Sequence, residues 1–166
     1  MVPPITKLYA VALLMLNLAS CASRPPMQHH MMMMSDRATA FTQTMRRLWA
    51  EEVILRRRFV ENRSPDVRTR LLAKQDEIAN AVAPYYGADT ATKFAELLEQ
   101  RAVMTADDPH ARENSAAIAA LLHLPTLAAM LDALLPMQEL SPAFSQGLRI
   151  ADEIANDIIK QYPQQF

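Results

Sequence analysis

The stretch FTQTMRRLWAEEVILRRRF, residues 41–59, decides the fold class because its apolar side chains recur at helical spacing. Positions 41, 45, 48, 52, 55 and 59 form one stripe with members three or four positions apart. It is apolar except at Glu52 and consists of Phe41, Met45, Leu48, Glu52, Leu55 and Phe59, widened by Trp49, Val53 and Val60. An apolar stripe of this width is typical of a helix that packs one face against a core. The pattern predicts a long amphipathic helix from about Asp36 to Asn62.

The rest of the chain repeats this pattern. Only two glycines occur in 166 residues, and good helix formers such as Ala, Leu, Met, Gln and Glu are abundant. Cap-then-proline signals predict helix starts at Ser64-Pro65-Asp66, Asp107-Asp108-Pro109 and Ser141-Pro142. We expect an all-α protein: an antiparallel four-helix-type bundle with an extra short broken helix. The expected later helices run to about Ala83, from Asp89 or Thr90 to Met104, through 116–135 with a break at Pro125, and to about Gln161.

Residues 116–135 are almost entirely apolar, so a membrane span is an alternative to a buried helical hairpin. A span needs roughly 20 uninterrupted apolar residues. His123, Pro125 and Asp132 interrupt this stretch, and charges within a span are costly. We therefore expect a buried hairpin or a broken helix.

The N-terminal residues have the pattern of a secretory signal peptide. Lys7 precedes an apolar run, and Leu18-Ala19-Ser20-Cys21 follows it. This tetrapeptide resembles the lipobox of bacterial lipoproteins, which implies cleavage before Cys21 and acylation of Cys21 with palmitate-type chains. Two alternatives remain: an ordinary signal with an incidental cysteine, and translation starting within Met31–Met34. We expect a signal peptide at 1–20, a lipidated tether at 21–34 and a bundle domain at 35–166.

The expected location is the bacterial cell envelope, on the outer membrane facing the periplasm if the host has two membranes. Cys21 is the only cysteine, so once it is lipidated the mature chain has no disulfide, thiol nucleophile or thiolate metal site. Lys plus Arg total 17 and Asp plus Glu total 18. This near balance argues against nucleic acid as a partner. The expected partners are the membrane, through the anchor, and a protein of the envelope.

The tether contains an unusual tract of methionine and histidine. The potential ligands are Met27, His29, His30, Met31, Met32, Met33 and Met34. Thioether sulfur suits Cu(I), and imidazole suits copper and zinc. One interpretation is copper binding or sensing by a flexible segment, and the other is a low-complexity spacer.

Charged and amide side chains interrupt the apolar stripes of several helices. They could meet in a buried polar layer made of Glu52, Gln75, Arg101, Gln146 and Asp152. The structural interpretation is that Glu52 pairs with Arg101 and that Gln75 satisfies the remaining hydrogen bonds. The functional alternative is a small-ligand or metal pocket. The arginines of the first helix form either a solvated face or a contact with anionic lipid headgroups.

No catalytic constellation stands out in the sequence. There is no Glu-x-x-His pair for a di-iron bundle and no nucleophile motif or phosphate-binding glycine loop. We therefore expect no enzyme and no cofactor apart from the Cu(I) alternative. The two hypotheses are a structural or interaction protein of the envelope, which would present an apolar groove or helix face, and a metal-binding protein.

Several stretches together resemble a family of small all-helical bacterial proteins without established activity. They are Leu48-Trp49 with Glu51, Val53 and Arg57; Arg70-Leu71-Leu72 with Gln75, Ile78 and Asn80; Pro84-Tyr85-Tyr86-Gly87; Lys93 with Leu97-Leu98; Ala151-Asp152; and Ile158 to Pro163 with Phe166. The resemblance covers roughly residues 45–166 and implies a helical bundle. Members of the family often have histidine where this chain has Glu52, Arg101 and Gln146, so any site built from those histidines is altered here.

Overall fold

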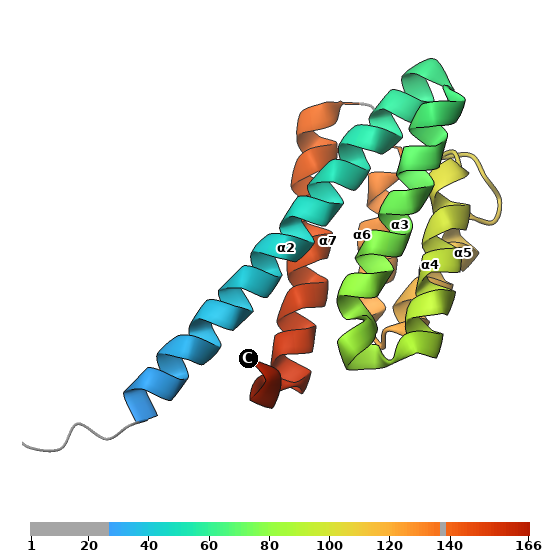
Figure 1. Cartoon of the computed structure of the whole chain (residues 1–166). Coiled ribbons are helices and arrows are strands. Elements are labelled where there is room, and N and C mark those ends of the chain that lie inside the picture. The colour runs from blue at the N-terminus through green and yellow to red at the C-terminus, as the bar shows by residue number, and fades with distance from the viewer. Residues whose placement is uncertain (1–26, 137–138) are drawn as a thin grey trace, which may run out of the picture.

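The computed structural model describes residues 27–136 and 139–166, and for 27–35 it describes the backbone alone. This part of the chain is all-helical and contains no strand, as predicted (Figure 1). Its elements are α2 (Met27–Asn62), α3 (Pro65–Tyr86), α4 (Ala88–Val103), α5 (Ala111–Leu121), α6 (Pro125–Leu134), α7 (Leu140–Gln161) and a short 3-10 turn, η2 (Pro163–Gln165). The predicted signal peptide and Cys21 lie outside the described residues.

Helix α2 starts earlier than the sequence pattern indicated. We expected a flexible tether up to Met34 and a helix starting near Ser35, but the helix already includes Met27. Methionine and glutamine are good helix formers, and no glycine or proline lies between Pro26 and Ser35 to stop the helix. Ser35 is therefore an interior residue rather than an N-cap. In Figure 1 the first turns of α2 project beyond the bundle.

Helices α2 and α7 pack side by side along most of the bundle (Figure 1). Helix α7 contributes a fully buried stripe of Ile150, Ala151, Ile154, Ala155 and Ile158. Gly147 allows the two helices to approach closely, because a Cβ there would lie 2.7 Å from Val53 Cγ2 and 3.5 Å from the Trp49 carbonyl oxygen. The contact forms the main part of a core that also includes Met45 and Leu48.

Helices α3 and α4 form a hairpin whose turn differs from the predicted one. Helix α3 starts at Pro65, as expected, but it continues through Pro84 to Tyr86. Gly87 then ends α3 and starts α4, with φ of 87°. Only glycine adopts this region readily, so the chain turns there and Asp89 and Thr90 are not the N-cap. The prediction of a helix start at Asp89 or Thr90 was therefore slightly late.

Helices α5 and α6 form the buried hairpin that the apolar stretch predicted. Ile118, Leu122, Leu127 and Leu131 are fully buried, and Pro125 begins α6. His123 has φ of 58° at the turn between the helices. Within residues 27–136 and 139–166, no helix is long and apolar enough to cross a membrane. Helix α7 then begins at Leu140, so Ser141 and Pro142 lie in its first turn rather than at its cap.

Candidate functional site

The structure buries four of the five residues of the predicted polar layer but does not join them into one network. Glu52, Gln75, Arg101 and Gln146 are buried, whereas Asp152 is half-buried near the surface. Each of the five side chains has different hydrogen-bond or ion-pair partners. The side chains therefore link helices at separate places.

Arg101 connects three helices from a buried position. It is 2% exposed and lies near the C-terminal end of α4. Its Nη1 donates to Ser115 Oγ on α5 at 2.6 Å, and its Nη2 donates to the carbonyl of Leu131 on α6. Burial, together with the nearby charge of Arg56, lowers the pKa of Arg101 to about 10. The guanidinium therefore keeps its charge at neutral pH.

Glu52 pairs with Arg56. The predicted ion pair between Glu52 and Arg101 is not formed. Its Oε1 lies 3.7 Å from Arg56 Nη1, one helical turn away on α2. Arg101 is already engaged by Ser115 and Leu131, and Arg56 donates to the Arg101 carbonyl at 2.5 Å. The other Glu52 oxygen, Oε2, has no hydrogen-bond partner among the described residues. Burial raises the pKa of Glu52, and the charges of Arg56 and Arg101 only partly oppose this.

The remaining residues of the predicted layer have separate local roles. Gln75 Nε2 donates to the carbonyl of Leu71 in its own helix at 3.0 Å, so it does not satisfy Glu52. Gln146 Nε2 donates to the Met130 carbonyl at 2.8 Å and so connects α7 to α6. Asp152 accepts two hydrogen bonds from Arg46, at 2.5 and 2.7 Å, which connect α7 to α2 at the surface.

Sequence reasoning missed three members of the network around Arg101. Asp132 accepts a hydrogen bond from Ser115 Oγ at 2.5 Å and lies at the edge of the buried group. It was visible as a charge inside an apolar stretch, and Arg56 was visible as a cation four residues after Glu52. Ser115 gave no signal, because one serine among alanines on a helix is not distinctive.

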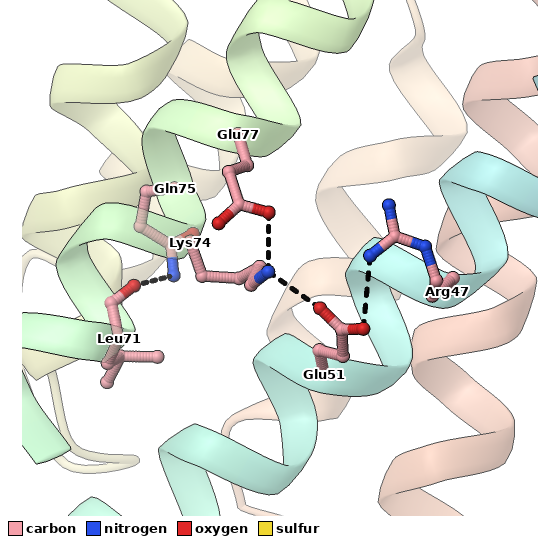
Figure 2. A network of polar contacts seen from close by, with 6 residues as sticks. All are labelled: Arg47, Glu51, Leu71, Lys74, Gln75 and Glu77. Atoms are coloured by element: carbon pink, nitrogen blue, oxygen red, sulfur yellow. Dashed lines mark hydrogen bonds and ion pairs between the residues drawn. The ribbon is translucent and has the colours of Figure 1, made fainter.

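A second polar group, centred on the buried Lys74, links α2 to α3 (Figure 2). Lys74 Nζ lies 2.6 Å from Glu51 Oε2 and 2.5 Å from Glu77 Oε2, and Arg47 Nη1 lies 3.1 Å from Glu51 Oε1. Hydrogen bonds from Lys74 lower the pKa of Glu51. Burial alone would lower the pKa of Lys74. The hydrogen bonds and charges of Glu51 and Glu77 have the larger combined effect, so the pKa of Lys74 is raised. This group links α2 to α3 through the ion pair of Lys74 with Glu51.

The predicted copper ligands are not tested by the structure. Their backbone is helical from Met27, and nothing is described of the side chains up to Ser35. Among the residues whose side chains are described, no group of three histidine, cysteine or carboxylate side chains could hold a metal ion. Copper binding by the tract stays a prediction, as does lipidation of Cys21.

A cleft of about 340 Å³ lies where the ends of four helices meet. It is bounded by the last turns of α2 and α4, the end of α6 and the first turn of α7. The apolar part of its lining includes Val53, Phe59, Val60, Ala102, Val103, Leu134, Leu140 and Ala143, and the charged part consists of Arg56, Arg57, Glu61, Arg63 and Glu139. None of the five residues of the predicted layer lines it.

The large exposed apolar side chains of the described part of the chain all line the cleft. Val60 is 57% exposed, Val103 38% and Leu140 48%, and these are the large hydrophobic side chains that the bundle leaves in solvent. All three line the cleft. Isolated exposed apolar residues are common, but a cluster of them around a concavity is typical of a binding surface. This cleft is the candidate functional site.

Comparison of the chain with family models, curated proteins and solved structures gives no match. The resemblance of residues 45–166 to small all-helical bacterial proteins therefore stays a prediction, with the bundle as the part of it that the structure confirms.

Proposed function

We propose that this chain is a lipid-anchored, non-catalytic interaction protein of the bacterial cell envelope, which presents the cleft at the end of its bundle to a binding partner. The observation that carries the proposal is the gathering of Val60, Val103 and Leu140 around one concavity. Exposed apolar side chains cost free energy in water, about 25 cal/mol per Å² of surface. Clustering them around a cleft makes that surface available for burial by a partner.

The anchor half of the proposal rests on Leu18-Ala19-Ser20-Cys21. Several acyl chains on Cys21 would hold the protein at the membrane, since each buried methylene contributes about 0.8 kcal/mol. In a host with two membranes, Ala22 in place of an aspartate directs the protein to the outer membrane, facing the periplasm. The cleft is then displayed within the envelope.

One experiment addresses both halves. Full-length protein carries a photoreactive phenylalanine analogue at Val103 in the cleft, or at Thr92, an exposed position of α4 outside it. It is expressed in a bacterium fed with labelled palmitate. We expect label and membrane association that Cys21→Ser abolishes, and an adduct from position 103 that Leu140→Asp abolishes. Equal adducts from positions 103 and 92, or no label on Cys21, would contradict the proposal.

A second candidate is copper binding by the Met/His tract. The supporting observation is a run of soft ligands, with four consecutive methionines after two histidines.

A further inference from the structure

The size of the cleft limits what can occupy it. Ligand-binding cavities begin at about 300 Å³, and the cleft measures about 340 Å³. The cleft therefore lies at the lower end of the range for ligand-binding cavities, which suits a small ligand with one narrow chain.

The apolar walls of the cleft favour an alkyl chain over a peptide as the ligand. Phe59, Ala102, Leu134 and Ala143 are buried apolar residues that line the cleft beneath the exposed Val60, Val103 and Leu140. An extended peptide would bring backbone N–H and C=O groups against these walls, and each unsatisfied group costs free energy comparable to a lost hydrogen bond. An alkyl chain has no such groups and is the better match.

The charges at the cleft point to an anionic head. Arg56 is compensated by Glu52, and Arg57 is paired with Glu61 at 2.5 Å. Arg63 is exposed, with its guanidinium 5.3 Å from the centre of the Phe59 ring. No carboxylate of the described residues forms an ion pair with Arg63, so it can bind a carboxylate or a phosphate at the edge of an apolar wall.

We propose that the cleft binds a single-chain anionic amphiphile, with its alkyl chain against Phe59, Val103 and Leu140 and its carboxylate or phosphate head at Arg63. This inference rests on the proposed function and specifies the chemistry of the partner. It also explains why exposed apolar side chains and a free guanidinium occur together at one end of the bundle. Glu139 also lines the cleft, and its negative charge would weaken the binding of an anion.

The test measures binding of dodecanoate by calorimetry, below its micelle concentration, to the chain Ala22–Phe166, which contains every helix described. We expect Arg63→Glu and Val103→Asp each to weaken binding at least tenfold and Glu139→Gln to strengthen it. Arg112→Glu, an exposed charge reversal on α5 outside the cleft, should leave the affinity unchanged. Uncharged dodecan-1-ol should bind more weakly, and Arg63→Glu should not change its affinity.

Further probes distinguish the source of the ligand. Dodecyl phosphate, dodecanoate and phosphatidylglycerol vesicles share an anionic head on alkyl chains. Binding of the soluble amphiphiles without vesicle co-sedimentation identifies a free amphiphile as the ligand class. Vesicle binding that Arg63→Glu abolishes identifies a lipid of the membrane surface.

The inference is overturned if none of these probes binds, or if binding is equally strong after Arg63→Glu and Val103→Asp. An adduct from position 103 to a protein, together with no binding of dodecanoate, would leave the proposed function standing and remove this inference. Circular dichroism of each variant checks that its helices are intact.

Discussion

Arg101 and Glu52 are the two residues at which this bundle departs from an apolar core. A buried cation is tolerated when its donors find acceptors, because an unpaired buried charge is costly. Both Nη atoms of Arg101 find acceptors, in Ser115 and the Leu131 carbonyl, and its Nε has no hydrogen-bond partner among the described residues. Glu52 has only a distant contact with Arg56 and an oxygen without a hydrogen bond among the described residues. We therefore expect that removing the charge of Arg101 lowers the stability of the protein, and that removing the charge of Glu52 raises it.

Replacing Arg101 with methionine should destabilise the protein. The substitution leaves Ser115, Asp132 and the Leu131 carbonyl without the cation that they surround, and breaking such a buried group costs about 3 kcal/mol. Urea unfolding followed by circular dichroism measures the loss. Arg112→Met, at an exposed position, should change stability by less than about 0.5 kcal/mol. Equal effects of the two substitutions would show that Arg101 is not a structural link.

Replacing Glu52 with glutamine should remove a pH-dependent loss of stability. Burial raises the pKa of Glu52, so the folded protein binds its proton more tightly than the unfolded chain. Wild-type stability therefore falls as pH rises from the ordinary glutamate pKa, about 4.3, to the raised pKa, and is constant above it. The glutamine variant has no proton to lose there.

The free energy of unfolding of Glu52→Gln minus that of the wild type should thus grow with pH, by about 1.4 kcal/mol for each unit by which the pKa is raised. Urea unfolding between pH 4 and 8 measures this difference. Glu96→Gln, at an exposed position of α4, serves as the matched control. A difference for Glu52→Gln that is independent of pH would mean that Glu52 titrates normally in the folded protein.

Sequence patterns identified the buried charges but not their partners. Glu52 and Arg101 each stood out as a charge on an apolar stripe, and both are buried. Which of them meet depends on how far each helix is rotated about its axis, and local spacing does not determine this rotation. Glu52 pairs with Arg56, four residues later on the same helix. This partner could have been predicted, because residues four positions apart on a helix are neighbours.

At the scale of elements, the close contact of α2 with α7 depends on Gly147. A Cβ at this position would lie 2.7 Å from Val53 Cγ2, and the branched valine side chain cannot turn away freely. Gly147→Ala should therefore destabilise the protein by about 1 kcal/mol, even though alanine favours helix by 0.5–1 kcal/mol.

A double-mutant cycle isolates this contact. In a Val53→Ala background the clash is absent, so Gly147→Ala should become stabilising through its helix propensity. Chemical denaturation of the four variants gives the coupling free energy. If Gly147→Ala has the same effect in both backgrounds, the helices do not meet through these two residues.

The helical start of α2 contains the Met/His tract and provides the test of the copper proposal. Ala22–Phe166 should bind Cu(I) in competition with a chromophoric chelator. Replacing Met27 and Met31–Met34 with leucine and His29 and His30 with alanine should abolish the binding while keeping good helix formers in place. His110→Ala, in the bundle, should have no effect. Binding that survives the replacement of the tract would place the metal elsewhere, and no binding by any variant would make the tract a spacer.

The helices themselves were largely predictable, and their ends were less so. The apolar period predicted the helices, and Pro65 and Pro125 marked two starts correctly. The helix starts at Met27 and Leu140 have no such signal in the sequence. The local sequence at each of these positions is compatible with either a helix or a loop. The turn at Gly87 depends on its positive φ. The sequence predicted a later helix start because Asp89 and Thr90 are both residue types that often form N-caps.

At the scale of the whole molecule, the cleft was not predictable from periodicity. It forms because the ends of α2 and α4 and the α6–α7 region meet at one end of the bundle. Val103 and Leu140 are each near a helix terminus, where an apolar side chain in the sequence gives no indication of whether a neighbouring helix covers it. Only the lengths of the packed helices decide this, and they leave Val60, Val103 and Leu140 exposed.

The opposite end of the bundle carries an aromatic cluster. Phe41, Tyr85 and Phe166 contact one another with ring centres 5.1–5.4 Å apart, and Tyr162 lies 5.8 Å from Tyr85. In Figure 1 the chain end marked C and the turn between α3 and α4 lie at the same end of the bundle as the start of α2. Helix α2 starts at this end, six residues after Cys21. The end with the aromatic cluster is therefore the one expected to face the membrane in the lipidated protein that we propose.

This arrangement predicts that the cleft stands away from the bilayer. The chain from Cys21 to Met27 spans at most about 22 Å when fully extended, whereas α2 from Met27 to Phe59 extends about 48 Å. Lipidated protein in liposomes, with a fluorophore at Arg37 or at Arg63, should show strong quenching by nitroxide-labelled headgroups at position 37 and little at position 63. Equal quenching at both positions would mean that α2 lies along the membrane. The cleft would then meet lipid directly, and the vesicle arm of the amphiphile experiment would have to show binding as well.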